Sequence, residues 1–179
     1  MLIRMITGRA VFPAIILGLA VAVACQNSQD SDDERSDAPP AVSGELLPGD
    51  AEGAGDQGLV GGHDVRLEAY LWRDFMPGPD MPPDGRPLRG VVRLRAVDSD
   101  SISGALDITY VWLKQGDVVW GAALTGPPSS EPPSTIEKGF ADGPMWTPET
   151  TADVIVKVVD AGGVTAYFRV PDQLIEKTY

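Results

Sequence analysis

The strongest constraint on the fold of this chain is an alternation of apolar and polar residues that begins near residue 65. Residues 65–72 read VRLEAYLW, with an apolar side chain at every second position. Further alternating or apolar runs cover residues 88–97, 105–114, 117–124, 152–160 and 164–170. A period of two is typical of a strand with one buried face, and no long stretch of this region keeps a helical period. The sequence therefore predicts an all-β domain.

Short glycine-containing connections predict antiparallel hairpins. Residues 115–116 (Gln-Gly) and 161–163 (Ala-Gly-Gly) each separate two apolar runs. Glycine favours such turns because it accepts positive φ angles. Proline-rich segments separate the other runs, and proline is confined to loops and sheet edges. We therefore expect residues 59–179 to form a single antiparallel β-sandwich of about seven short strands.

The run at 105–114 predicts which of its side chains share a face. Strict alternation places Leu106, Ile108, Tyr110 and Trp112 on one side of the strand. Burial is the default for a tryptophan in such a position. We expect Trp112 to be buried.

The first 24 residues have the three zones of a secretory signal peptide. Arg4 and Arg9 precede an apolar run of fourteen residues, 11–24, and Cys25 follows. A membrane-spanning helix needs about 20 apolar residues, so this run is too short to cross. A basic segment followed by about 7 to 15 apolar residues predicts cleavage after residue 24. The alternative is a short buried helix of the mature fold.

Residues 22–25, Ala-Val-Ala-Cys, resemble the lipobox of bacterial lipoproteins, in which the cysteine becomes the first mature residue and is acylated. The resemblance implies a diacylglyceryl thioether on Cys25, usually with a third chain on its amine. Two or three acyl chains anchor a protein stably, whereas one binds reversibly. By the same resemblance, Gln26 implies the outer membrane. The expected location is the cell envelope, lipid-anchored and periplasmic or surface-exposed.

Residues 25–58 are expected to form an acidic, disordered tether between the lipid and the domain. Residues 26–58 contain nine acidic side chains, one basic side chain and no aromatic one. Such a segment buries too little apolar surface to offset its ordering entropy, and like charges extend it. The alternative is a binding tail for a basic partner or a cation.

The residue types argue against catalysis and against metal binding. Cys25 is the only cysteine and His63 the only histidine. The mature chain therefore has no free thiol nucleophile if Cys25 is acylated, and it has no histidine-rich metal site. His63 lies in a glycine-rich segment, LVGGHD, where we expect a loosely packed imidazole. We expect no enzyme activity, no cofactor and no metal.

Four side chains are the candidate binding residues of the domain: Trp72, Phe75, Met76 and Trp146. Trp72 falls on the polar side of its strand, and Trp146 lies in a loop. Together they would form an apolar patch at one end of the sandwich, and such patches mark recognition sites. The alternative is burial beneath the loops as a satellite cluster.

The sequence does not predict the cluster of basic residues that nucleic-acid binding requires. Arg93 and Arg95 occupy alternate positions of one expected strand and are interpreted as a solvated face. Phosphate binding depends on clustered basic side chains, and the chain carries a net charge of −12. Nucleic acid is therefore excluded as an expected partner.

Residues 70–77 (YLWRDFMP) and 142–149 (DGPMWTPE) resemble motifs of small uncharacterised bacterial lipoproteins. The number of strands resembles that of immunoglobulin-like modules in bacterial surface and periplasmic proteins. The resemblance implies an immunoglobulin-like sandwich and no particular activity. We expect a non-catalytic binding module with a protein or glycan partner. Two alternatives stay open: a carbohydrate-binding module that uses Trp72 and Trp146 as stacking platforms, and a small immunoglobulin-like proteinase inhibitor.

Replacement of Cys25 by alanine tests the lipid anchor. Because no thiol remains to be acylated, the variant should accumulate as unprocessed precursor and lose metabolic labelling with palmitate. A Gln26→Ala variant serves as the control and should keep the label. Labelling that persists in Cys25→Ala would contradict the assignment.

Overall fold

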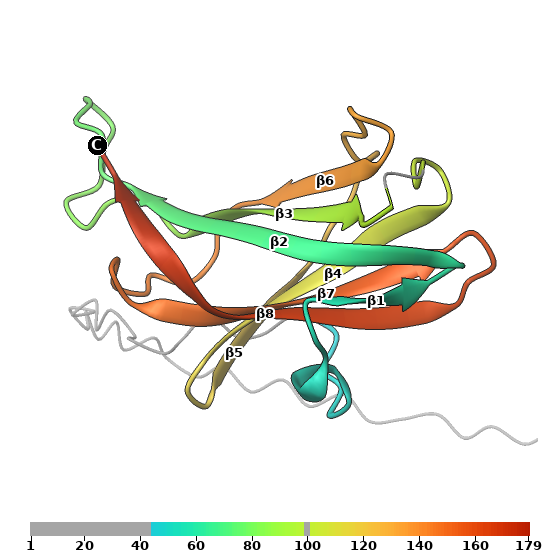
Figure 1. Ribbon diagram of the computed structural model, residues 1–179. Helices are drawn as coiled ribbons and strands as arrows, with labels where there is room; N and C mark the ends of the chain where they lie inside the picture. The colour runs from blue at the N-terminus through green and yellow to red at the C-terminus, as the bar shows by residue number, and fades with distance from the viewer. Residues whose placement is uncertain (1–43, 99–100) are drawn as a thin grey trace, which may run out of the picture. The chain divides into compact units, whose positions relative to one another are not determined.

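The computed structural model describes residues 44–98 and 101–179, and this part of the chain is built from strands (Figure 1). The expected all-β fold is confirmed. One short 3-10 helix precedes the strands, η1 (Ala51–Gly53). The strands are β1 (Gln57–Val60), β2 (His63–Asp74), β3 (Arg89–Ala96), β4 (Leu106–Gln115), β5 (Val118–Ala123), β6 (Thr135–Phe140), β7 (Thr151–Asp160) and β8 (Thr165–Thr178). Cys25 and the signal peptide lie outside the described residues.

The strands form a curled sheet in the order β5-β4-β7-β8-β2-β3-β6, with β1 beside β2. The first part of β8 pairs antiparallel with β7, and its last part pairs parallel with β2, with Leu71 opposite Ile175. The long strand β8 thus joins two layers, β5-β4-β7-β8 and β2-β3-β6. The result is a sandwich-like all-β fold in which one long strand belongs to both layers. The sequence predicted antiparallel pairing throughout, so the parallel pairing of β2 with β8 differs from that prediction.

Both expected hairpins are present. β4 and β5 pair antiparallel across the turn at Gly116, whose φ is 58°. β7 and β8 pair antiparallel across a turn in which Gly163 has a φ of 84°. Positive φ angles are the reason that glycine occupies both turns.

A β-bulge in β4 changes which of its side chains face the core. The register with β7 shifts between Ile108 and Tyr110. Ile108 before the bulge and Val111 after it both pack in the main core between the layers. Tyr110 and Trp112 face outward instead and belong to a second cluster. The prediction of one shared face for residues 106 to 112 is therefore wrong, because a bulge inverts the alternation beyond it.

Residues 44–56 lie across the outer face of β4, β7 and β8, and this segment is named the N-terminal strap. The Trp112 indole Nε1 donates a hydrogen bond of 2.8 Å to the carbonyl oxygen of Glu45. The ammonium of Lys157 lies 2.8 Å from the Glu45 carboxylate. The second cluster joins the strap to the sheet through Leu47, Ala51, Tyr110, Trp112, Ile155 and Tyr167. As a result, Trp112 is fully buried.

The strap corrects the expected boundary of the folded domain. Composition predicted a disordered tether over residues 25–58 and a domain that begins at residue 59. The structure instead places η1 and the start of β1 within this segment, and the Leu67 amide donates a hydrogen bond of 2.7 Å to the carbonyl oxygen of Asp56. The reason is tertiary: Leu47 and Ala51 meet an apolar face that the composition of their own segment does not reveal.

Removal of the strap should destabilise the domain. A chain that begins at Gly55 keeps β1 but exposes Trp112 and Tyr110 to water. Burial of large apolar side chains contributes about 2 to 4 kcal/mol here, so the free energy of unfolding in urea should fall by about that amount relative to a chain that begins at Gly44. The tryptophan fluorescence of the folded state should also shift to longer wavelength. Equal stabilities would show that the strap is dispensable.

Candidate functional site

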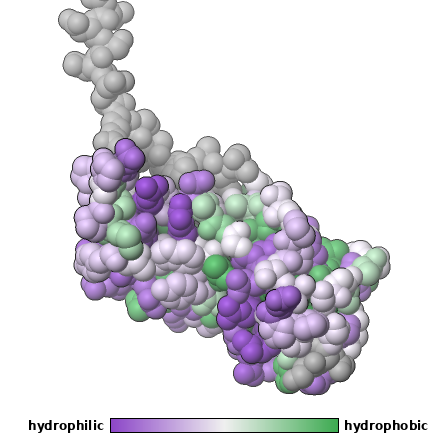
Figure 2. All heavy atoms as spheres, turned by 90° about the horizontal axis from the view of Figure 1, so that it is seen from above, coloured by the Kyte–Doolittle hydropathy of each residue, from purple (hydrophilic) through white to green (hydrophobic). Residues whose placement is uncertain are grey.

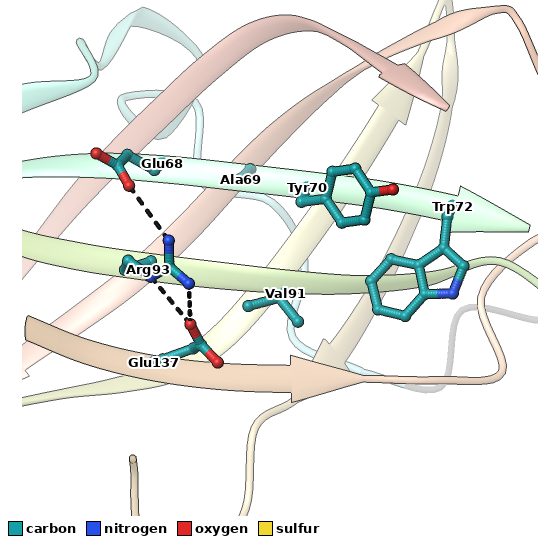
Figure 3. A pocket seen from close by; sticks show the side chains of 7 residues that line it. All are labelled: Glu68, Ala69, Tyr70, Trp72, Val91, Arg93 and Glu137. Atoms are coloured by element: carbon teal, nitrogen blue, oxygen red, sulfur yellow. Dashed lines mark hydrogen bonds and ion pairs between the residues drawn. The ribbon is translucent and has the colours of Figure 1, made fainter. Parts of the chain in front are cut away.

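The outer face of β2, β3 and β6 carries a hollow of about 410 Å³ (Figure 3). Its volume lies within the range of about 300 to 1,000 Å³ that is typical of small-molecule sites. Figure 2 views the molecule from above Figure 1, the side on which these three strands lie, and shows strongly hydrophilic residues next to hydrophobic ones. The lining residues are Glu68, Ala69, Tyr70, Trp72, Val91, Arg93 and Glu137.

One part of the hollow is an aromatic pair on β2. The rings of Tyr70 and Trp72 stack with their centroids 5.2 Å apart and their planes at 26°. The Tyr70 hydroxyl donates a hydrogen bond of 2.8 Å to the Glu176 carboxylate on β8. This hydrogen bond raises the pKa of Tyr70, because it holds the proton beside a negative charge. The Tyr70 hydroxyl is thus tied to β8 while Trp72 stays half-buried at the edge of the hollow.

Another part is an ionic cluster formed by Glu68, Arg93 and Glu137. The three residues come from adjacent strands, because the register places Arg93 directly opposite Glu68 and Glu137. The Arg93 Nε donates a hydrogen bond of 2.9 Å to Glu137 Oε2, and its Nη1 lies 3.6 Å from Glu68 Oε2. The hydrogen bonding to Glu137 raises the pKa of Arg93, with a further contribution from the charge of Glu68. The cluster therefore presents fixed donors and acceptors at the surface.

The structure separates two of the predicted binding residues. Trp72 lines the hollow, but the side chain of Trp146 packs against the main core. The Trp146 carbonyl oxygen accepts a hydrogen bond of 3.1 Å from Arg73, which points to the opposite side of β2 from Trp72. The two indoles therefore do not share one surface, and the expected single patch does not form.

Phe75 and Met76 lie in the loop that follows β2. Phe75 contacts two cations, with the Lys177 ammonium 4.6 Å and the Arg73 guanidinium 5.1 Å from its ring centroid. Met76 is 56% exposed and lines a separate, smaller hollow of about 220 Å³ with other residues of the same loop. These two residues belong to the end of the sandwich and not to the hollow on the sheet.

Arg73 positions the loops at this end, and this role was not predicted from the sequence. Its side chain is buried, its Nε donates to the Arg86 carbonyl oxygen at 3.0 Å, and its Nη2 donates to that of Asp84. Together with its bond to Trp146, these contacts tie the loops on both sides to β2. Burial lowers the pKa of Arg73, and the charge of Asp84 acts in the opposite direction. The sequence did hold a signal for this role: Arg73 is a charged residue at a position where the alternation of β2 places inward-facing side chains.

His63 is the first residue of β2, so the imidazole belongs to the folded sheet and not to a preceding segment. Within residues 44–98 and 101–179, no three histidine, cysteine, aspartate or glutamate side chains are placed to hold a metal ion. The part of the chain that the structure describes also lacks any helix long and apolar enough to cross a membrane.

The fold and the site together define a β-sandwich with an open aromatic and ionic hollow on one face. Comparisons of the chain with protein families, with curated proteins and with solved structures found no match. The function is therefore inferred from the geometry of the site.

Substitution of Arg73 tests its positioning role. In Arg73→Met, the loop carbonyl groups lose a charged donor, and each such bond contributes about 1.5 to 3 kcal/mol. We expect the free energy of unfolding to fall by about 2 to 4 kcal/mol and hydrogen exchange to accelerate in residues 76–88 and 141–150. The exposed Arg89→Met is a matched control and should change stability by less than about 0.5 kcal/mol. Equal effects of the two substitutions would contradict this role.

Proposed function

We propose that this protein is a non-catalytic binding module and that the hollow on β2, β3 and β6 is its recognition surface. The observation that carries the proposal is the contrast between the two outer faces of the sandwich. The strap covers the aromatic side chains of the β4-β7-β8 face, whereas Tyr70 and Trp72 stay accessible on the other. Accessible aromatic side chains next to fixed polar groups are typical of recognition surfaces.

The charged groups of the hollow favour binding over catalysis. Both carboxylates of the cluster are ion-paired with Arg93. Carboxylates that are paired in this way can accept hydrogen bonds from a ligand. A general acid, in contrast, must donate a proton to its substrate. The proposal accordingly includes no cofactor and no reaction.

The proposed location follows from the sequence. Residues 11–24 and the lipobox-like segment that ends at Cys25 favour export and lipid anchoring at the bacterial cell envelope, with Gln26 favouring the outer membrane. A binding module in this position would meet protein or glycan partners of the envelope or of the cell exterior.

A carbohydrate-binding role is the second candidate. It is favoured by the position of Trp72 beside an array of hydrogen-bond donors and acceptors. Trp146 does not contribute a second platform, because its side chain packs on the core. The proteinase-inhibitor alternative depends on size and strand count alone.

Photo-crosslinking in intact cells tests the recognition surface. A benzoylphenylalanine at position 70 should give a specific adduct, because Tyr70 borders the hollow. The same probe at position 118 on β5 is the control, because Val118 is 49% exposed but outside the hollow. The adduct at position 70 should disappear when Trp72→Ala is added. Identical adducts at both positions, or none at position 70, would refute the proposal.

A further inference from the structure

We infer that the ligand of the hollow is an uncharged polysaccharide chain, with a sugar ring stacked on Trp72 and its hydroxyl groups bound by the ionic cluster. This inference rests on the proposed role of the hollow as the recognition surface. It follows from three properties of the site: its mixed polarity, its charge and its open shape.

The mixed polarity of the hollow matches that of a sugar ring. Figure 3 shows the aromatic pair toward one end, the ionic cluster toward the other, and Val91 between them. A pyranose has two faces of C–H groups and a rim of hydroxyl groups. Its faces therefore require an apolar wall such as the Trp72 indole, and its rim requires polar groups close beside that wall.

The ionic cluster offers donors and acceptors that a hydroxyl group can use together. A hydroxyl both donates and accepts, whereas a guanidinium only donates and a carboxylate only accepts. Both hydrogen bonds from Arg93 go to Oε2 of Glu137, so Oε1 of that carboxylate is not used by Arg93. Neighbouring hydroxyl groups of one sugar can therefore bond to the arginine and to the carboxylate without separating the ion pair.

The charge of the site favours an uncharged ligand. Glu68 also pairs with Arg95 at 3.4 Å, so the two carboxylates and the two guanidinium groups balance, while the whole chain carries −12. Anionic ligands such as nucleic acid, phosphate groups or acidic polysaccharides meet no excess of positive charge here, and the net charge of the chain repels them. A cationic peptide would have to compete with Arg93 for carboxylates that are already paired. A neutral, hydroxyl-rich ligand meets neither obstacle.

The open shape favours a chain over a single sugar. The hollow extends over three neighbouring strands, β2, β3 and β6, at the surface of the sheet. Tight small-molecule sites bury most of their ligand, about 70 to 90% of its surface, which a surface hollow does not achieve with one ring. Rings before and after the one on Trp72 would add contact along the face. Several copies on one membrane would add avidity.

The experiment is affinity electrophoresis of the full-length chain, purified in a non-ionic detergent. Native gels contain one of four neutral polysaccharides, namely hydroxyethyl cellulose, dextran, galactomannan or glycol chitin, or the anionic polysaccharide alginate. We expect at least one neutral polymer to retard the protein and alginate not to do so. Retardation by alginate alone would overturn the inference.

The variants locate the binding site. Trp72→Ala removes the platform and Val91→Trp fills the hollow from its floor, and each should weaken retardation about tenfold or more. Tyr179→Ala removes an aromatic side chain that is 74% exposed outside the hollow and should leave retardation unchanged. Thermal unfolding shows whether each variant is folded. Retardation that is unchanged in both folded hollow variants would overturn the inference.

The same panel separates failure of the ligand class from failure of the binding role. If no neutral polysaccharide retards the protein while the crosslink at position 70 still depends on Trp72, the ligand is not a glycan and the recognition surface stands. If both the retardation and the crosslink are absent, the hollow is not a recognition surface, and both proposals fall.

Discussion

The β-bulge in β4 is the feature on which the division between the two faces of this sandwich depends. By inverting the alternation after Ile108, it turns Trp112 out of the main core. An exposed indole on a sheet face is costly, and the strap removes that cost by placing Leu47 and Ala51 over it. One inserted residue thus requires a cover on the β4-β7-β8 face, and this leaves the β2-β3-β6 face as the accessible one.

The alternation of β2 also places Trp72 and Trp146 on different sides of the strand. Leu71 and Arg73 point inward, so Trp72 between them points to the open face. Arg73 in turn holds the carbonyl group of Trp146, whose ring packs against the core. The arginine therefore stabilises the loop end of the sandwich, while its neighbour in sequence lies in the hollow on the other side of the strand.

Local pattern was sufficient for most of the strands and insufficient for their partners. Alternation and glycine turns predicted the β4-β5 and β7-β8 hairpins. Strand β6 was missed because a charged residue, Lys138, occupies an inward position and interrupts the apolar alternation of the strand. In the fold, Lys138 pairs with Asp107 at 2.8 Å. Trp72 was found from its own strand. Glu137 was not, because its place beside Arg93 depends on the register between β3 and β6, which only the tertiary fold defines.

Stability does not explain the ionic cluster. Side chains of Arg93 and Glu137 are 41% and 34% exposed, and ion pairs with this much water contact contribute about 0 to 1 kcal/mol. Yet the register places three charged residues in one row across three strands, next to the accessible aromatic pair and on the face that the strap does not cover. Two carboxylates that hold one guanidinium fix its orientation, and a fixed orientation reduces the entropy cost of binding a ligand. The cluster is therefore better explained as a means of presenting polar groups than as a means of holding the sheet together.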